Sequence, residues 1–191
     1  MINNKLDIVI ALIERPNEQI TINRLSQELD IDYKNVYNIV KKLERDNLIF
    51  LEKNGNAYNC ILNKEVHPII FEAEFNRRNN FLKKKSFKVL ADKLSKLNFP
   101  FIALIFGSYA KGTETKNSDI DLMVICENSR DKEIQRTISL FPQDIHLITL
   151  TSEEFHSMAN SKEFSVVAEA ISNNIILIGI EDYYRMLENV G

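Results

Sequence analysis

The chain has 191 residues, of which 45% are apolar and 27% are charged, and its formal net charge is −3. This length accommodates one large domain or two small ones, and the composition is that of an ordinary soluble globular protein. No apolar run is long enough to span a bilayer, and the first five residues lack the features of a secretory signal, so no membrane association is expected. Cys60 and Cys126 form no motif and imply no disulfide, which predicts a cytoplasmic location.

Charge is distributed unevenly along the chain. Residues 1–63 hold 8 basic and 9 acidic side chains, residues 64–98 hold 9 and 4, and residues 99–191 hold 7 and 14. The middle segment is therefore positive and the C-terminal part is acidic. An acidic C-terminal part is consistent with a site that is filled by cations.

The first 63 residues show the pattern of three helices followed by a β-hairpin. Asp32 is placed to cap the third helix, and Asn54-Gly55 between two alternating segments is a strong hairpin signal. Apolar spacing predicts helices over 5–14, 21–29 and 33–47 and strands over 48–51 and 57–62. This order resembles a winged helix-turn-helix domain.

The resemblance makes residues 33–44 the recognition helix, which would bind double-stranded DNA. Asparagine and lysine side chains bind base edges and phosphates. The candidate DNA-binding residues on its outer face are Lys34, Asn35, Tyr37, Asn38, Lys41 and Lys42. The alternative is a module for protein contact or dimerisation, because the segment as a whole is close to neutral. Many winged-helix proteins act as dimers, so a homodimer is a candidate state.

Residues 64–98 are expected to be a mainly helical connector that joins two modules. Asn79-Asn80 is expected to interrupt an otherwise long helix. Arg77-Arg78 and Lys83-Lys84-Lys85 form a basic cluster. Such a cluster is either a solvated helix surface or an electrostatic contact with nucleic acid or nucleotide phosphate.

The most specific motif lies between two apolar runs that are expected to be buried strands, 101–106 and 122–125. The first run ends at Gly107-Ser108, a turn whose backbone amides can cradle a phosphate. Asp119 and Asp121 precede the second run, and alternate strand residues share a face, so both carboxylates point the same way. Two adjacent carboxylates repel each other unless a cation lies between them, and divalent ions suit that position.

This combination of Gly-Ser and Asp-x-Asp resembles the nucleotidyltransferase superfamily of DNA polymerase β, and most closely its minimal (MNT-type) domains. The resemblance implies metal-dependent transfer of a nucleoside monophosphate from a nucleoside triphosphate, with ATP as the expected nucleotide and Mg²⁺ or Mn²⁺ as the cofactor. Gly107 and Ser108 would hold the triphosphate, and Asp119 and Asp121 would hold the metal ions. Lys111 would help to neutralise the phosphates, or is simply solvated.

The resemblance also implies a third catalytic and metal-binding carboxylate on the following strand, and here the chain departs from the pattern. Matching 145–149 to the family places His146 in the carboxylate position, with Asp144 about 7 Å away along the strand. Asp144 is the expected catalytic and metal-binding substitute. Alternatively, the nucleophile-activating metal is weakly held, or the domain binds nucleotide without efficient catalysis.

The rest of the chain predicts a small mixed sheet covered by helices. We expect a helix over 129–140, a strand over 144–150, and a helix capped by Ser152. The fold class is therefore α+β, with a winged helix-turn-helix domain at 1–63, a helical connector at 64–98 and a nucleotidyltransferase-like domain at 99–191.

Three functions follow from these patterns. The first is an enzyme that transfers a nucleoside monophosphate, with AMP expected, to a hydroxyl on a protein, a nucleic acid or a small molecule. The MNT-type resemblance favours a protein acceptor such as a HEPN-type toxin, which would be a separate chain. The second is a DNA-binding regulator whose nucleotidyltransferase domain binds nucleotide with little or no turnover. The third, a purely structural dimerising protein, is disfavoured by the intact motif.

Overall fold

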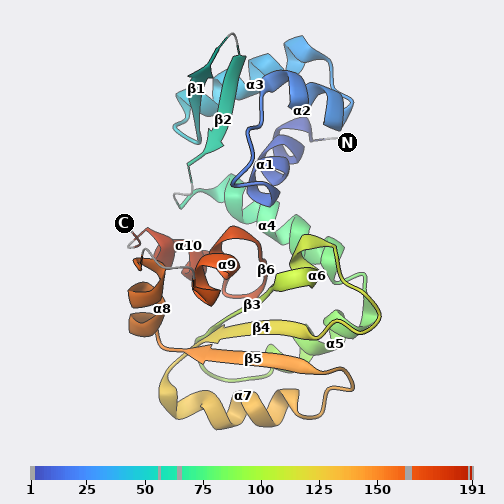
Figure 1. The fold of residues 1–191 in the computed structure, drawn as a ribbon, viewed down its shortest axis with the longest axis vertical. Helices are drawn as coiled ribbons and strands as arrows, with labels where there is room; N and C mark the ends of the chain where they lie inside the picture. Colours follow the sequence, from blue (N-terminus) through green and yellow to red (C-terminus); the bar gives the residue numbers. More distant parts are fainter. Residues whose placement is uncertain (1–2, 56, 64–65, 162–164, 189, 191) are drawn as a thin grey trace. The chain divides into compact units, whose positions relative to one another are not determined.

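The computed structural model describes residues 3–55, 57–63, 66–161, 165–188 and 190 (Figure 1). The chain divides into two compact units, Met1–Ala73 and Glu74–Gly191. Within the described residues, no helix combines the length and the apolar character needed to cross a membrane.

The first unit contains the predicted three helices and hairpin. Thr21 caps the second helix by accepting a hydrogen bond from the Arg24 amide, and Asp32 caps the third by accepting one from the Asn35 amide, as expected for these side chains. The elements are α1 (Asn4–Glu14), α2 (Ile22–Leu29), α3 (Tyr33–Arg45), β1 (Ile49–Asn54) and β2 (Ala57–Leu62).

The hairpin strands β1 and β2 are antiparallel, and the pair Asn54↔Ala57 closes the turn. Gly55 supplies the left-handed conformation that such a tight turn requires, with φ of 59°. The inward faces of the three helices form the core of this unit, with fully buried side chains at Ile8, Leu25, Val36, Val40 and Leu43.

The predicted connector is two helices, α4 (Pro68–Phe81) and α5 (Lys85–Leu94). Asn79-Asn80 does not interrupt α4, contrary to expectation, and the break falls at residues 82–84. Tertiary contacts outweigh the low helix propensity of asparagine here. Arg77 and Arg78 donate hydrogen bonds to the carbonyls of Asn174 and Leu177, which hold this end of α4 in place.

A buried polar network fixes the second half of α4 within the second unit. Glu74 accepts hydrogen bonds from Arg77 at 2.6 Å and from the Tyr184 hydroxyl at 2.7 Å. Asn174 donates to the Tyr183 hydroxyl at 2.9 Å. Burial and the nearby Glu74 carboxylate raise the pKa of both tyrosines. The second compact unit therefore begins inside the segment that was expected to be a connector.

The second unit is built on a four-stranded mixed sheet in the order β5-β4-β3-β6. Strand β3 pairs antiparallel with β4 and β6, whereas β4 and β5 are parallel. This arrangement confirms the expected small mixed sheet within an α+β fold. The elements are β3 (Ile102–Phe106), α6 (Gly107–Lys111), β4 (Ile120–Ile125), a 3-10 turn (Asn128–Arg130), α7 (Asp131–Ile138), β5 (Ile145–Leu150), α8 (Ser152–Ala159), α9 (Val166–Ser172), β6 (Ile175–Ile178) and α10 (Ile180–Leu187).

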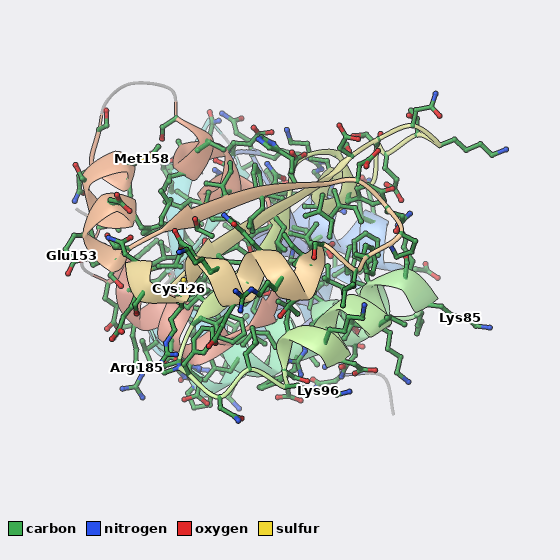
Figure 2. The ribbon with its side chains drawn as sticks, turned by 90° about the horizontal axis from the view of Figure 1, so that it is seen from below. Lys85, Lys96, Cys126, Glu153, Met158 and Arg185 are labelled. Carbon is green, nitrogen blue, oxygen red and sulfur yellow. The ribbon has the colours of Figure 1, made fainter. Side chains whose placement is uncertain are left out.

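Helices cover both faces of this sheet, which explains why its central strands are apolar apart from Asp121. Helices α5 and α7 pack on one face against Ala103, Leu122 and Val124. Figure 1 shows α7 on one side of the sheet and α9 on the other. Figure 2 views the side of the sheet that α7 covers. Lys85 lies toward the right of this view, and Cys126 and Glu153 lie toward the left.

Ser152, the expected cap, is the first residue of helix α8, and the cap is Thr151. Thr151 accepts a hydrogen bond from the Glu154 amide, and the Glu154 side chain accepts one from the Thr151 amide. This reciprocal pair satisfies two backbone donors at once, which a cap at Ser152 would not do.

Candidate active site

The glycine turn after β3 touches the acidic start of β4. Phe106 pairs with Asp121 across the two antiparallel strands, so the residue after Phe106 lies against the Asp121 side chain. A Cβ atom built on Gly107 would lie 2.2 Å from Asp121 Oδ2, and Gly107 has a φ of 66°. Only glycine meets both requirements, because it has no side chain and adopts left-handed φ without strain. The Gly-Ser turn and the Asp-x-Asp motif are therefore parts of one site.

Asp119 immediately precedes β4, and Asp121 is its second residue. The apolar residues Ile120 and Leu122 alternate with these two acids along the chain. Ile120 and Leu122 are fully buried in the core on the α5 and α7 face. Strand alternation therefore directs both carboxylates to the opposite face. Asp121 is half-buried and Asp119 is exposed, so the acidic pair opens to solvent.

Strand β5 brings His146 directly beside Asp121. The parallel register pairs Asp121 with His146, and His146 Nδ1 lies 3.2 Å from Asp121 Oδ1. Asp144 comes just before β5, and its carbonyl accepts a hydrogen bond from the Ile120 amide at 3.0 Å. Asp144 also lines a cavity of about 490 Å³ against α7. The side chain of His146 thus contacts Asp121 across the two strands.

The loop between α6 and β4 is held by its own polar contacts. The Thr115 amide donates to Ser118 Oγ at 2.9 Å, and the Tyr109 hydroxyl donates to the Ser118 carbonyl at 3.4 Å. The Tyr109 ring packs edge-on against Phe87 of α5, with 5.1 Å between ring centroids. These contacts fix the backbone that immediately precedes Asp119.

Lys111 forms an ion pair with Glu169 of α9, with 2.6 Å between Lys111 Nζ and Glu169 Oε1. Both side chains are partly exposed, and ion pairs of this kind contribute at most about 1 kcal/mol. An exposed ion pair of this strength leaves Lys111 exchangeable between Glu169 and another anion. The sequence pattern did not single out Glu169, because it is 58 residues away from Lys111 along the chain.

The basic cluster of residues 77–85 serves several purposes in the structure. Arg77 and Arg78 hold α4 through the contacts described above, and Lys83 and Lys85 are exposed. Lys84 forms an ion pair with Glu114, and this hydrogen bond lowers the pKa of the Glu114 carboxyl. The Lys84 ammonium also lies 5.7 Å from the centroid of the Tyr109 ring. One lysine of the cluster therefore reaches the loop that precedes Asp119.

The candidate site offers oxygen and nitrogen ligands for a divalent cation, but those of its side chains that the structure describes do not form a complete coordination shell. Among the described residues, no three His, Cys, Asp or Glu side chains converge closely enough to hold a metal by themselves. Asp121 and His146 are in contact, and Asp119 lies two residues earlier on the same face. Mg²⁺-type ions are commonly held by one or two carboxylates plus substrate phosphates. This donor set fits a cation whose remaining ligands are phosphate oxygens and water.

Helix α3 of the first unit presents the candidate DNA-binding residues. Lys41 is half-buried, forms an ion pair with Glu44 at 2.7 Å and lies 5.9 Å from the centroid of the Tyr58 ring. The hydrogen bond to Glu44 raises the pKa of Lys41. Tyr37 stacks on Tyr33, and both rings are exposed. The exposed candidates are Lys34, Asn35, Tyr37, Asn38 and Lys42.

Both cysteines are free and buried. Burial raises the pKa of the Cys60 thiol to about 12 and also raises the pKa of the Cys126 thiol. A raised pKa keeps a thiol in its protonated, less nucleophilic form.

Comparison with known proteins agrees with the motif. Residues 88–182 match the family described as polymerase beta, nucleotidyltransferase. A stretch of 73 residues is 34% identical to the protein adenylyltransferase MntA of Shewanella oneidensis, covering 36% of this chain and 50% of that protein. The chain thus spans about half the length of this curated relative. A crystal structure of a toxin–antitoxin with AMP-PNP is 24% identical, with a TM-score of 0.35, covering 52% of this chain and 83% of that one. The family match supports a nucleotidyltransferase-superfamily domain over residues 88–182.

Proposed function

We propose that the second unit is a metal-dependent nucleotidyltransferase that moves a nucleoside monophosphate, AMP in the first instance, from a nucleoside triphosphate to a hydroxyl acceptor. The observation that carries this proposal is the contact between Gly107 and Asp121. A turn that binds phosphate and carboxylates that bind a metal ion act together when a polyphosphate and its cation occupy the same place.

Each part of the site has a role in this reaction. The backbone at Gly107 and Ser108 would bind the triphosphate, and Lys111, once released from Glu169, would add positive charge. Asp119 and Asp121 would hold the cation, and Asp144 stays the predicted third carboxylate. The bound cation would neutralise charge on the phosphoryl oxygens and the leaving pyrophosphate. The chain itself therefore aligns the triphosphate for in-line attack.

A protein is the acceptor that we propose. The similarity to an adenylyltransferase that is named as acting on protein supports this choice. The acceptor would then be a separate chain, with a toxin as the first candidate, and its serine, threonine or tyrosine hydroxyl would form the new phosphodiester bond. A cytoplasmic location remains the prediction for a reaction that consumes ATP.

Incubation with α-labelled ATP and Mg²⁺ or Mn²⁺ tests the proposal. Wild-type protein should release pyrophosphate and label an acceptor, and Asp119→Ala should lose this activity by at least about 100-fold, because the loss of a metal carboxylate removes transition-state stabilisation. Asp144→Asn tests the third-carboxylate prediction. Glu153→Gln is the matched control, because Glu153 is a carboxylate that follows the far end of β5. Equal labelling by wild type and Asp119→Ala would refute the proposal.

A second candidate function rests on the first unit. We infer that residues 1–63 form a winged helix-turn-helix that binds double-stranded DNA through α3, since five of its six candidate residues are exposed. In this alternative the protein is a transcriptional regulator that binds DNA as a dimer and whose second unit binds nucleotide with little or no turnover. The replacement of a carboxylate by His146 beside Asp121 favours it. If the protein binds nucleotide without releasing pyrophosphate and also binds DNA in a salt-dependent way, the regulator function is supported over the enzyme.

A further inference from the structure

We propose that His146 makes this site select a divalent cation with affinity for nitrogen, Mn²⁺ or Co²⁺, over Mg²⁺. The inference rests on the proposed function, because it concerns the cation of the same nucleotide site. It assigns His146 as a specificity-determining residue through one added metal ligand, His146 Nδ1.

The spacing between the two side chains is that of neighbouring ligands on one ion. His146 Nδ1 and Asp121 Oδ1 are 3.2 Å apart. Two ligands that each lie about 2.1 Å from an octahedral ion, at right angles, are about 3.0 Å apart. An ion can therefore replace the direct contact between the two atoms with little movement of either side chain.

Strand register keeps His146 at this position. Ile145 and Leu147 pack against the core on the α7 face, so the residue between them must point to the face of the paired acids. A shift of one residue would move His146 into the core and both apolar residues into solvent. The location of the imidazole is thus set by the burial of its neighbours.

Exposure leaves the ring free to take up an ion. The His146 side chain is 64% exposed, whereas that of Asp121 is 28% exposed. A partly buried carboxylate backed by the Gly107 turn gives a fixed anchor, and a solvent-facing imidazole can turn to complete the coordination. Entry of a cation from solvent together with the triphosphate is therefore unobstructed by either residue.

Ligand chemistry then determines which ion is preferred. Mg²⁺ is bound almost entirely through oxygen and gives up water reluctantly. Imidazole suits later first-row metals, whose affinity for nitrogen sites rises from Mn²⁺ towards Co²⁺ and beyond. An imidazole also contributes no negative charge, which weakens the site for an ion that relies on charge alone. Both effects shift the preference in the same direction.

The test combines metal binding with a spectroscopic signature of nitrogen. The protein is loaded with Mn²⁺ and a non-hydrolysable ATP analogue, and pulsed electron paramagnetic resonance measures coupling between Mn²⁺ and ¹⁴N. We expect the coupling of an imidazole nitrogen in wild type and its loss in His146→Gln. The chain has three histidines, and His156, whose Nε2 lies 3.1 Å from the Met186 carbonyl, provides the control. His156→Gln should keep the signal.

A second arm compares Mn²⁺ with Mg²⁺ by calorimetry in the presence of the same analogue. His146→Asp should lower the ratio of Mn²⁺ to Mg²⁺ affinity by about tenfold or more, because it restores an all-oxygen set. An unchanged ratio in this variant, or Mn²⁺ and nucleotide bound without nitrogen coupling, would overturn the inference and leave the proposed function standing. Absence of nucleotide binding by wild type would instead overturn the proposed function itself.

Discussion

The two units use their polar residues differently. In the first, ion pairs such as Arg24 with Glu28 and Lys41 with Glu44 join partly exposed side chains. In the second, Glu74 and Arg77 form a pair whose side chains are 2% and 5% exposed, and Asp121 lies directly against the turn at Gly107. Surface pairs tolerate change, whereas buried pairs and close contacts do not. The first unit therefore has a surface of exchangeable polar contacts, and the second holds its polar groups in fixed, close contacts.

The largest expected effect comes from the buried pair. Glu74→Ala should lower the free energy of unfolding of the second unit by about 3–5 kcal/mol, because it leaves the Arg77 charge in the interior without its close carboxylate partner. Glu44→Ala, which removes an exposed pair of the same i, i+3 spacing, should cost less than about 1 kcal/mol. Chemical denaturation of both variants measures the difference. Equal losses would remove the contrast between the units.

The contact between the glycine turn and the acidic strand gives the next largest effect. Gly107→Ala should weaken nucleotide binding by more than about tenfold, because the added Cβ displaces Asp121 and disturbs the charged contacts made there. Gly112→Ala is the matched control, since Gly112 has a φ of 67° and nothing within 4 Å of the added atom. It should show only the backbone strain of about 1–2 kcal/mol in stability. Titration with a fluorescent ATP analogue separates the two variants, and a similar Kd for both would refute the contact argument.

The proposed DNA-binding role of α3 predicts a smaller and more distributed effect. Replacing Lys34 and Lys42 together by Ala should weaken DNA binding severalfold at low salt and reduce the salt slope by about 2, one per lysine that contacts phosphate. The double variant of Lys93 and Lys96 in the second unit is the control of equal charge. Fluorescence anisotropy over a series of salt concentrations gives both numbers. Identical slopes for both double variants would favour the protein-contact role of this unit.

The smallest expected effect concerns the ion pair beside the turn. Glu169→Gln frees Lys111 and should tighten nucleotide binding by about twofold to fivefold, within the energy of an exposed ion pair. Lys111→Gln should weaken binding by a similar factor. Calorimetry with the non-hydrolysable analogue at two ionic strengths checks both, and the effect should shrink as salt rises. Tighter binding in Lys111→Gln would show that the lysine does not face the phosphates.

Local signals in the sequence predicted the positions of several residues. Gly107 and Asp121 are each joined directly to a strand, and the pairing of β3 with β4 brings them together. Matching the strand at 145–149 placed His146 level with Asp121, as the register of β4 and β5 has it. These positions were predictable because strand alternation and register transmit position from one residue to the next. The roles of these residues, and that of Asp144, stay predictions.

Contacts between distant residues were not predictable in this way. Arg77 is 97 residues away from Asn174 in the chain, and no local pattern marks either as a partner of the other. The same contacts explain why helix α4 continues through Asn79-Asn80, where propensity alone predicted a break. The cap at Thr151 was displaced by one residue for a related reason, since the reciprocal pair with Glu154 selects between two adjacent hydroxyls.

The division of the chain inside α4 has a practical consequence for dissecting it. A fragment that starts at residue 99, where the catalytic domain was expected to begin, would lack the carboxylate to which Tyr184 donates and the guanidinium that covers the Asn174 carbonyl. It would also expose the apolar surface that Phe87, Leu90 and Leu94 cover. An autonomous fragment of the second unit must therefore include at least the second half of α4, from Glu74 onward, and a shorter one is expected to aggregate.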